Sequence, residues 1–327
     1  MTLAELFSFG FMQRALVAAL ISGLLCPAVG VYIVQRRLSL LGDGLGHVAI
    51  AGVGLAMLTN TAPLPVAIVV CLVGALGIEL LRQRGHATAD VGLAILFYGG
   101  ISVGLLLAGL AGQGAGTLSQ YLFGSLITVT TGDIGLIIAL AVVVLVVGIG
   151  LSPQLFSVCV DEDYARTQGL PVRWINLLIV AMAAVTVTLS MRTVGLLLVS
   201  ALMVVPVAAA QNLAGSFRAT IGIAMVVGVA AGGGGTLISA AANTPSGPTI
   251  VVFAIVVFAL AAGWTVVRRH RHTAVVDVAA PTEPAQHVVA EAATEVAGAP
   301  AVLHDDHVDY VLDGHRHAPH GDHYDEH

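Results

Sequence analysis

The chain has 327 residues, of which 57% are hydrophobic and only 10% are charged. A typical soluble domain carries about 25% charged residues, so the composition excludes a water-soluble globular protein. It predicts an all-α fold, a polytopic membrane helical bundle. All thirteen basic residues are arginines. Because a P-loop places a lysine at the β- and γ-phosphates of ATP, the chain cannot build that nucleotide site by itself.

Charge divides the chain into two parts. Residues 1–276 contain twelve arginines and eight acidic residues, whereas residues 277–327 contain one arginine and eleven acidic residues. We therefore predict a transmembrane domain over residues 1–271 and a disordered, acidic, His-rich cytoplasmic tail over residues 272–327. Alanine, proline, glutamate and valine dominate the first half of the tail, a composition that buries little surface.

The membrane spans are predicted from the apolar runs, since a helix needs about 20 apolar residues to cross a bilayer. About nine spans are expected, the last two being parts of one long uncharged run that is divided by the breaker NTPSGP at 243–248. The passage 111–132 is too polar for a span, although it could hold a short or re-entrant helix around 118–127. The runs are 15–34, 44–58, 64–81, 91–110, 134–151, 174–191, 193–210 and 219–267.

Arginine placement predicts the orientation, because cytoplasmic loops carry an excess of basic residues. Nine alternating spans that put the pair Arg36 and Arg37 inside leave only Arg14 and Arg192 outside. The amino terminus is then extracytoplasmic and the tail is cytoplasmic.

Asp43 and His47 are unusual because they stand at the start of an apolar run. Four residues apart on a helix, the two side chains share one face. A carboxylate and an imidazole suit a divalent transition metal, and charge inside a membrane is costly and tends to be functional. In the alternative interpretation, Asp43 only caps the helix and His47 bonds a backbone carbonyl. Two ligands from one helix also leave a zinc site incomplete.

Residues 161–171 (DEDYARTQGLP) form the longest charged segment of the membrane domain and lie on its predicted cytoplasmic side. Acidic residues at the start, with Gly169 and Pro171 at the end, predict a short amphipathic helix. This segment is either a solvated loop or a docking element for a cytoplasmic partner.

Three segments, in order, resemble one family. Residues 36–47 (RRLSLLGDGLGH) are similar to the signature of the ZnuB-type permeases, the integral membrane subunits of ATP-binding-cassette importers for zinc, manganese or ferrous iron. Residues 161–172 resemble that family's coupling helix, and residues 192–206 resemble a late span. The resemblance covers roughly residues 10–267. The glycines at 44 and 46 depart from the more usual alanine and serine.

The resemblance implies that Asp43 and His47 line the metal route and that cytoplasmic ATP-binding-cassette ATPase subunits dock at the coupling helix. It also implies a homodimer in the cell membrane and an extracytoplasmic metal-binding protein, with no nucleic-acid partner. Zinc, or manganese or ferrous iron, is then the transported substrate rather than a permanently bound cofactor, and the chain is not an enzyme. The ATPase-coupling residues are Asp161, Glu162, Asp163, Tyr164, Arg166 and Gly169.

The end of the tail is rich in histidine among carboxylates, a composition that suits zinc, nickel or copper. We expect either a flexible cytoplasmic metal buffer or sensor, which favours zinc over manganese as the substrate, or a tail that is merely solubilising. The candidate ligands are His304, His307, His315, His317, His320, His323 and His327.

Other functions have weaker support. A stand-alone secondary carrier usually has several ionisable groups at mid-membrane, and only Asp43, His47, Glu79 and Asp133 are candidates here. An intramembrane metalloprotease is disfavoured because no His-Glu-x-x-His motif occurs. A membrane scaffold does not explain three family motifs in order.

Overall fold

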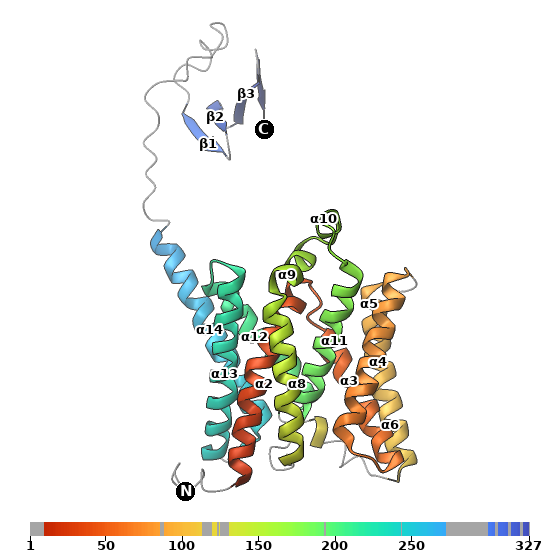
Figure 1. The fold of residues 1–327 in the computed structure, drawn as a ribbon. Helices are drawn as coiled ribbons and strands as arrows, with labels where there is room; N and C mark the ends of the chain where they lie inside the picture. The colour runs from red at the N-terminus through yellow and green to blue at the C-terminus, as the bar shows by residue number, and fades with distance from the viewer. Residues whose placement is uncertain are drawn as a thin grey trace. The chain divides into compact units, whose positions relative to one another are not determined.

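The computed structural model describes residues 10–85, 88–112, 120–122, 124, 131–192, 194–242, 244–272, 300–304, 307–312, 315–320 and 323–326. The chain divides into two compact units, residues 1–267 and residues 268–327. The first unit is a bundle of helices that stand side by side (Figure 1).

The helices of the bundle follow the apolar runs of the sequence. Their bounds are α2 Gly10–Gln35, α3 Leu41–Thr59, α4 Pro63–Gln83, α5 Ala89–Ala94, the π-helix η1 Ile95–Gly99, α6 Gly100–Leu110, α8 Thr131–Gly150, α9 Ser152–Val160, α10 Glu162–Thr167, α11 Val172–Met191, α12 Leu196–Leu213, α13 Phe217–Ala242 and α14 Ser246–His272.

The prediction of a membrane bundle of about nine helices is confirmed. Among the described residues, eight helices are long and apolar enough to cross a bilayer, with α5, η1 and α6 together making one of them. The expected seventh span is α12, whose apolar part Leu198–Leu213 is shorter. In Figure 1, α2 begins at the end of the bundle opposite α10, and α14 ends on the side of α10. In the passage 111–132, residues 120–122 are helical, and most of the passage lies outside the described residues.

Local sequence sets several helix ends. Proline 63 occupies the first turn of α4, where its missing N–H costs nothing. Asn60 ends α3 with a left-handed φ of 51°, a conformation that asparagine tolerates. Gly195 lies directly before α12 and has a φ of 93°. Glycine suits this position because a residue with a side chain is strained at that backbone angle.

Small residues bring the helices close together. A Cβ on Gly228 of α13 would overlap the backbone of Gly23 on α2, and one on Gly232 would lie 2.5 Å from the carbonyl oxygen of Ala19. A Cβ on Gly52 of α3 would likewise lie 2.5 Å from the Cα of Ala67 on α4. Any larger residue would keep the helices apart at these positions. Close packing matters here because lipid supplies no hydrophobic force between membrane helices.

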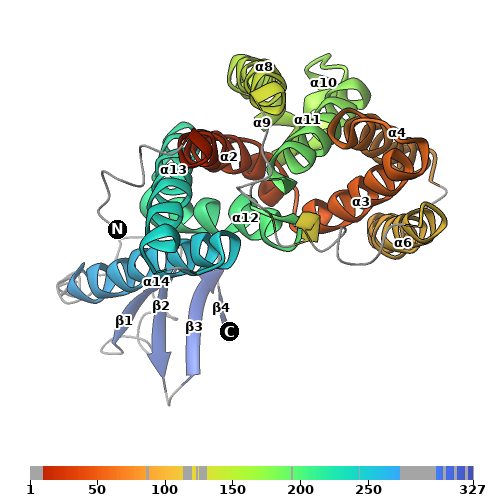
Figure 2. The ribbon, with the colours of Figure 1, turned by 90° about the horizontal axis from the view of Figure 1, so that it is seen from below.

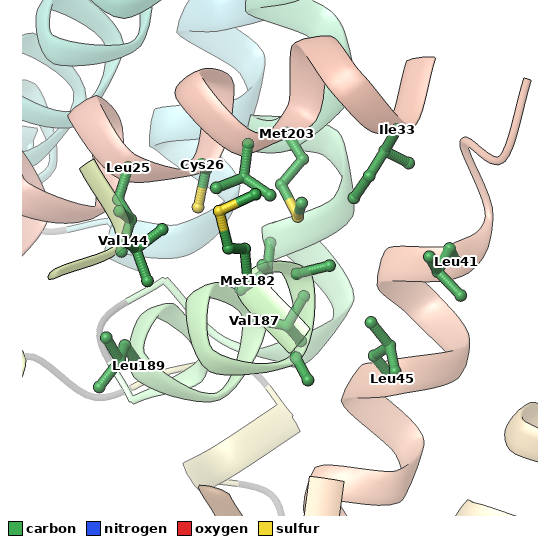
Figure 3. Close-up of a cluster of buried hydrophobic side chains, with 14 of the residues drawn as sticks. Leu25, Cys26, Ile33, Leu41, Leu45, Val144, Met182, Val187, Leu189 and Met203 are labelled. Atoms are coloured by element: carbon green, nitrogen blue, oxygen red, sulfur yellow. The ribbon is translucent and has the colours of Figure 1, made fainter. Parts of the chain in front are cut away.

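Helix α3 lies inside the bundle. Most of its residues are buried, and it is flanked by α4, α6, α11 and α12. Seen from below in Figure 2, α3 lies between α11 and α6. A continuous apolar core joins α2, α3, α8, α11 and α12. Figure 3 shows Cys26, Met182 and Met203 pointing toward one another within it, while Leu45 lies apart from them on α3.

The second unit contains four strands: β1 Ala301–His304, β2 His307–Leu312, β3 His315–His320 and β4 His323–Glu326. They form one antiparallel sheet in the order β1-β2-β3-β4. Disorder over residues 272–327 stays a prediction, although these four short strands lie within that range. Expecting disorder relied on composition, whereas alternation of Val308, Tyr310 and Leu312, followed by an Asp-Gly pair, favours a hairpin. Residues 273–299, the Pro- and Ala-rich part, lie outside the described residues.

Candidate metal route and coupling helix

Glycines let α12 approach the start of α3, where the candidate metal ligands lie. A Cβ on Gly42 would lie 3.0 Å from Ser200 Oγ of α12, and a Cβ on Gly46 would overlap the side chain of Leu196. The glycines at 42 and 46 therefore let α12 pack closely against the first turns of α3.

Asp43 is tied to a helix far away in the sequence. Ser200 Oγ donates a hydrogen bond to Asp43 Oδ1 over 2.6 Å. Asp43 lies in the first turn of α3, where the helix dipole favours an anion, but it is not the N-cap: that position is Leu40, which makes no side-chain capping bond. The short hydroxyl–carboxylate bond fixes the direction of the carboxylate in the core of the bundle.

His47 is enclosed by the fourth span. Its side chain is only 5% exposed, and its ring meets the Phe97 ring edge to face, with centroids 4.1 Å apart. Phe97 lies on η1, a π-helical turn of the kind that often marks functional sites. Within the described residues, His47 Nδ1 is buried and has no hydrogen-bond partner. Among those residues, Nδ1 therefore does not make the bond to a backbone carbonyl that the alternative interpretation assigns to His47.

The structure places Asp43 and His47 one helical turn apart on α3 and, among the residues that it describes, brings no further protein ligand to them. In the described part of the helical bundle, no three side chains of His, Cys, Asp or Glu gather where they could hold a metal ion. One copy of the chain thus offers one carboxylate and one imidazole, which is fewer than the three protein ligands of a typical zinc site.

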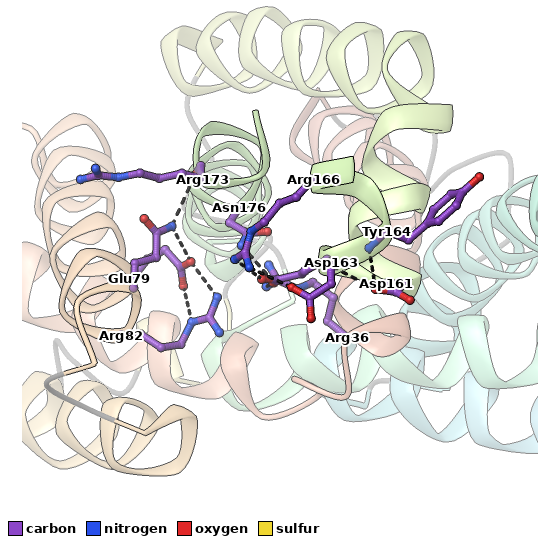
Figure 4. A network of polar contacts seen from close by, with 11 residues as sticks. Arg36, Glu79, Arg82, Asp161, Asp163, Tyr164, Arg166, Arg173 and Asn176 are labelled. Carbon is purple, nitrogen blue, oxygen red and sulfur yellow. Dashed lines mark hydrogen bonds and ion pairs between the residues drawn. The ribbon is translucent and has the colours of Figure 1, made fainter. Parts of the chain in front are cut away.

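The other acidic candidates inside the bundle are paired with arginines. Glu79, which is buried, accepts two hydrogen bonds of 2.8 Å from Arg82 Nε and Nη2, as Figure 4 shows. Asp133 Oδ2 lies 2.6 Å from Arg192 Nη1. Both carboxylates therefore have an arginine partner. The partner of Asp133 is Arg192, one of the two arginines predicted on the extracytoplasmic side.

The short helix predicted over residues 161–171 is confirmed as α10. Asp161 is its N-cap, and its carboxylate accepts hydrogen bonds of 2.9 Å from the backbone N–H groups of Asp163 and Tyr164. Gly169, with φ of 77°, ends the helix, and its N–H bonds the carbonyl of Arg166. The helix thus has a sequence-encoded start and stop.

Helix α10 lies at one end of the bundle and has an inner and an outer face (Figures 1 and 4). Ala165 is fully buried, whereas Tyr164 is 57% exposed. Asp163 and Arg166 form an exposed ion pair of 2.9 Å. The outer face therefore carries an exposed aromatic ring and charges of both signs.

The inner face of α10 is held by Glu162. Its Oε1 accepts hydrogen bonds from Arg36 Nη2 at 2.7 Å and from Asn176 Nδ2 at 3.0 Å. Arg36 follows α2 and precedes α3, and Asn176 lies on α11. One carboxylate thus joins α10 to two transmembrane segments.

Burial raises the pKa of the Cys159 thiol to about 12, with the positive charge of Arg36 opposing this effect and the negative charge of Glu162 adding to it. Cys159 lies on α9, directly before α10. It is a free cysteine and is buried. The thiol therefore stays protonated and unreactive near the Arg36–Glu162 pair.

The tail histidines lie on the four strands, apart from His327, which lies outside the described residues. His304 pairs across strands with His307, and His320 pairs with His323. His315 and His317 both lie on β3.

Sequence reasoning found the ends of α10 and the position of Asp43 and His47 on one helix. It did not find Ser200, Phe97 or the Arg36–Glu162 pair. Ser200 is a polar residue within the apolar run 193–210, which is a weak signal. Nothing in the sequence shows which helix it meets.

The helical domain is similar to known membrane proteins. Residues 8–264 match the model of the ABC 3 transport family. The chain is 29% identical over 258 residues to the manganese transport system membrane protein MntC of Halalkalibacterium halodurans, covering 79% of this chain and 88% of that protein. It is 27% identical over 252 residues to the high-affinity zinc uptake system membrane protein ZnuB of Haemophilus influenzae, covering 77% of this chain and 97% of that protein.

A solved structure shares the fold. The chain superposes with a TM-score of 0.72 and 27% identity on a chain of PsaBC from Streptococcus pneumoniae in complex with Fab, covering 80% of this chain and 95% of that one. The matched family region ends before the strands of the tail. The chain is a multi-pass membrane protein and belongs to the ABC 3 transport family, the permeases of ATP-binding-cassette transporters for metal ions.

Proposed function

We propose that the chain is the membrane-spanning subunit of an importer for a divalent transition metal, most favourably zinc, that works by alternating access driven by separate ATPase subunits. The observation that carries this proposal is the pair Asp43 and His47, a carboxylate and a buried imidazole on the central helix of a metal-transporter fold. Zinc is favoured by the imidazole at this site and by the histidines of the tail, because manganese prefers oxygen ligands.

Asp43 and His47 are proposed to contact the passing metal. The buried Nδ1 of His47 has no partner among the described residues, and buried polar atoms usually have one. Asp43 is held in direction by Ser200. Two donors per chain bind an ion weakly, which suits a transport route that must also release it, and a second copy of the chain in a homodimer would double the number of donors.

Helix α10 is proposed to dock the ATPase subunits, with Tyr164, Asp163 and Arg166 on the contact face. The remaining coupling residues, Asp161, Glu162 and Gly169, shape and anchor the helix. Closure of the ATPases would move α10, and the Glu162 contacts would pass that movement to the segments that follow α2 and begin α11. An extracytoplasmic binding protein would deliver metal to the opposite side.

Metal uptake by cells tests the proposal. Cells that lack their own zinc importers receive this chain with its ATPase and binding protein, and accumulation of radioactive zinc and manganese is compared. We expect uptake that requires the ATPase and is lost in Asp43→Ala and His47→Ala variants. Thr59→Ala, an exposed residue at the other end of α3, serves as the matched control. Uptake that persists without the ATPase would instead support a stand-alone secondary carrier.

A further inference from the structure

The antiparallel sheet in the tail orders its histidines. The register pairs His304 with His307 between β1 and β2, and His320 with His323 between β3 and β4. Between β2 and β3 it pairs Tyr310 with His317 and Leu312 with His315. Each pair of neighbouring strands is separated by only two residues along the chain.

Continuing the β2–β3 register toward the start of β2 aligns His307 with His320, because each step back along one antiparallel strand is one step forward along the other. In an up-and-down sheet, the β1–β2 and β3–β4 connections lie at the same end. The four residues His304, His307, His320 and His323 therefore form one row across all four strands, which we call the histidine row.

Residues that are aligned across strands belong to the same face of a sheet, and successive residues of one strand belong to opposite faces. The histidine row thus occupies one face. His315 and His317, an odd number of positions from His320, belong to the other face. Asp309, two positions from His307, shares the face of the histidine row and is fully buried.

This placement suits a transition metal. Directly opposed residues have Cβ atoms about 4.5–5.5 Å apart, a spacing at which two imidazoles can bind one ion. Adjacent strands are about 4.8 Å apart, so the whole row spans about 14 Å and one ion can use only neighbouring members of it. A buried carboxylate on the same face adds negative charge that favours a cation.

We propose that the histidine row is a binding site for a divalent transition metal that prefers imidazole, such as zinc, nickel or copper, centred on His307 and His320. The site lies outside the residues that match the family. The metal affinity of this site depends on the position of each histidine in the sheet. The metal affinity of an unstructured buffer would depend only on the number of histidines.

The matched test removes two histidines at a time from the full-length chain, purified in detergent and carrying Asp43→Ala and His47→Ala to silence the transport route. The row variants are His307→Thr with His320→Thr, and His304→Thr with His323→Thr. The control is His315→Thr with His317→Thr on the opposite face. Threonine is used because it favours strands. Zinc binding is measured by equilibrium dialysis with atomic emission detection.

We expect the central row variant to lower zinc affinity by at least about tenfold, since losing even an outer-shell partner of a metal ligand costs about that much. The outer row variant should lose less, and the opposite-face control should bind like the parent. Equal losses in all three variants, or undiminished binding in both row variants, would overturn the proposal. Because every variant lacks the same number of histidines, composition alone cannot produce the expected order.

Discussion

Arg36 and Glu162, 126 residues apart in the chain, are joined by a hydrogen-bonded ion pair in which Nη2 lies 2.7 Å from Oε1. The Arg36 side chain is only 6% exposed. Asn176 donates to the same carboxylate oxygen. Because Arg36 leads into α3 and Glu162 begins α10, the pair is a polar link between the proposed docking helix and the segment that precedes the helix of Asp43 and His47.

Breaking this pair should separate ATP hydrolysis from transport. Glu162→Gln keeps the shape of the side chain but leaves the nearly buried Arg36 without its counter-charge. Coupling free energies between sites are typically about 1–3 kcal/mol, so we expect zinc uptake per ATP hydrolysed to fall at least about fivefold. The measurement is uptake and hydrolysis in proteoliposomes that contain the complete transporter.

Asp90→Asn is the matched control for this experiment. Asp90 is exposed in the first turn of α5 and is not part of α10. Exposed charges of this kind contribute little, so the ratio of uptake to hydrolysis should stay unchanged. An equal effect of the two variants would argue against a specific role of the Arg36–Glu162 pair.

Ser200 should affect metal handling through Asp43. Ser200→Ala removes the hydrogen bond of 2.6 Å that orients the carboxylate, without changing the charge. Loss of a group that orients a metal ligand typically costs about 10–100-fold in affinity or activity. We expect the KM for zinc uptake to rise while the protein remains in the membrane at wild-type amounts. An unchanged KM, together with lost uptake in Asp43→Ala, would mean that the carboxylate is positioned without the serine.

The contact between α2 and α13 should be sensitive to a single methyl group. Gly228→Ala places a Cβ against the backbone of Gly23, and overpacking of this kind costs about 1–3 kcal/mol. Gly77→Ala, where a Cβ meets nothing within 4 Å, should be neutral or slightly stabilising because alanine favours helices. Thermal unfolding in detergent, followed by circular dichroism, should separate the two. Similar midpoints for both variants would contradict this packing.

Cys159 should resist thiol reagents in the folded protein. With its pKa raised to about 12, only a very small fraction of the molecules carries the reactive thiolate at pH 8. Burial raises the pKa of the thiol because it disfavours the charged thiolate. The reactivity of Cys159 should therefore increase with pH up to the raised pKa. Maleimide labelling of a Cys26→Ala, Cys71→Ala variant should be slow in mild detergent and complete in sodium dodecyl sulfate. Rapid labelling in mild detergent would show that α9 is open to solvent.

The sequence by itself determined the helical bundle, the spans, the ends of α10 and the place of Asp43 and His47 on one helix. These features depend on local composition and on residues a few positions apart, such as Asp161 with Tyr164 or Gly169 with Arg166, so the chain encodes them within a single turn or run. The resemblance of three short motifs was sufficient to indicate the family.

Only the tertiary structure decided which distant residues meet. Ser200 reaches Asp43 across 157 positions, and Phe97 closes over His47 from another span. The helices here are apolar almost all round, so periodicity cannot tell which faces pack together. The tail illustrates the same limit: its composition suggested disorder, whereas strand register, a long-range property of backbone hydrogen bonds, aligns four histidines that the sequence shows only as a scattered set.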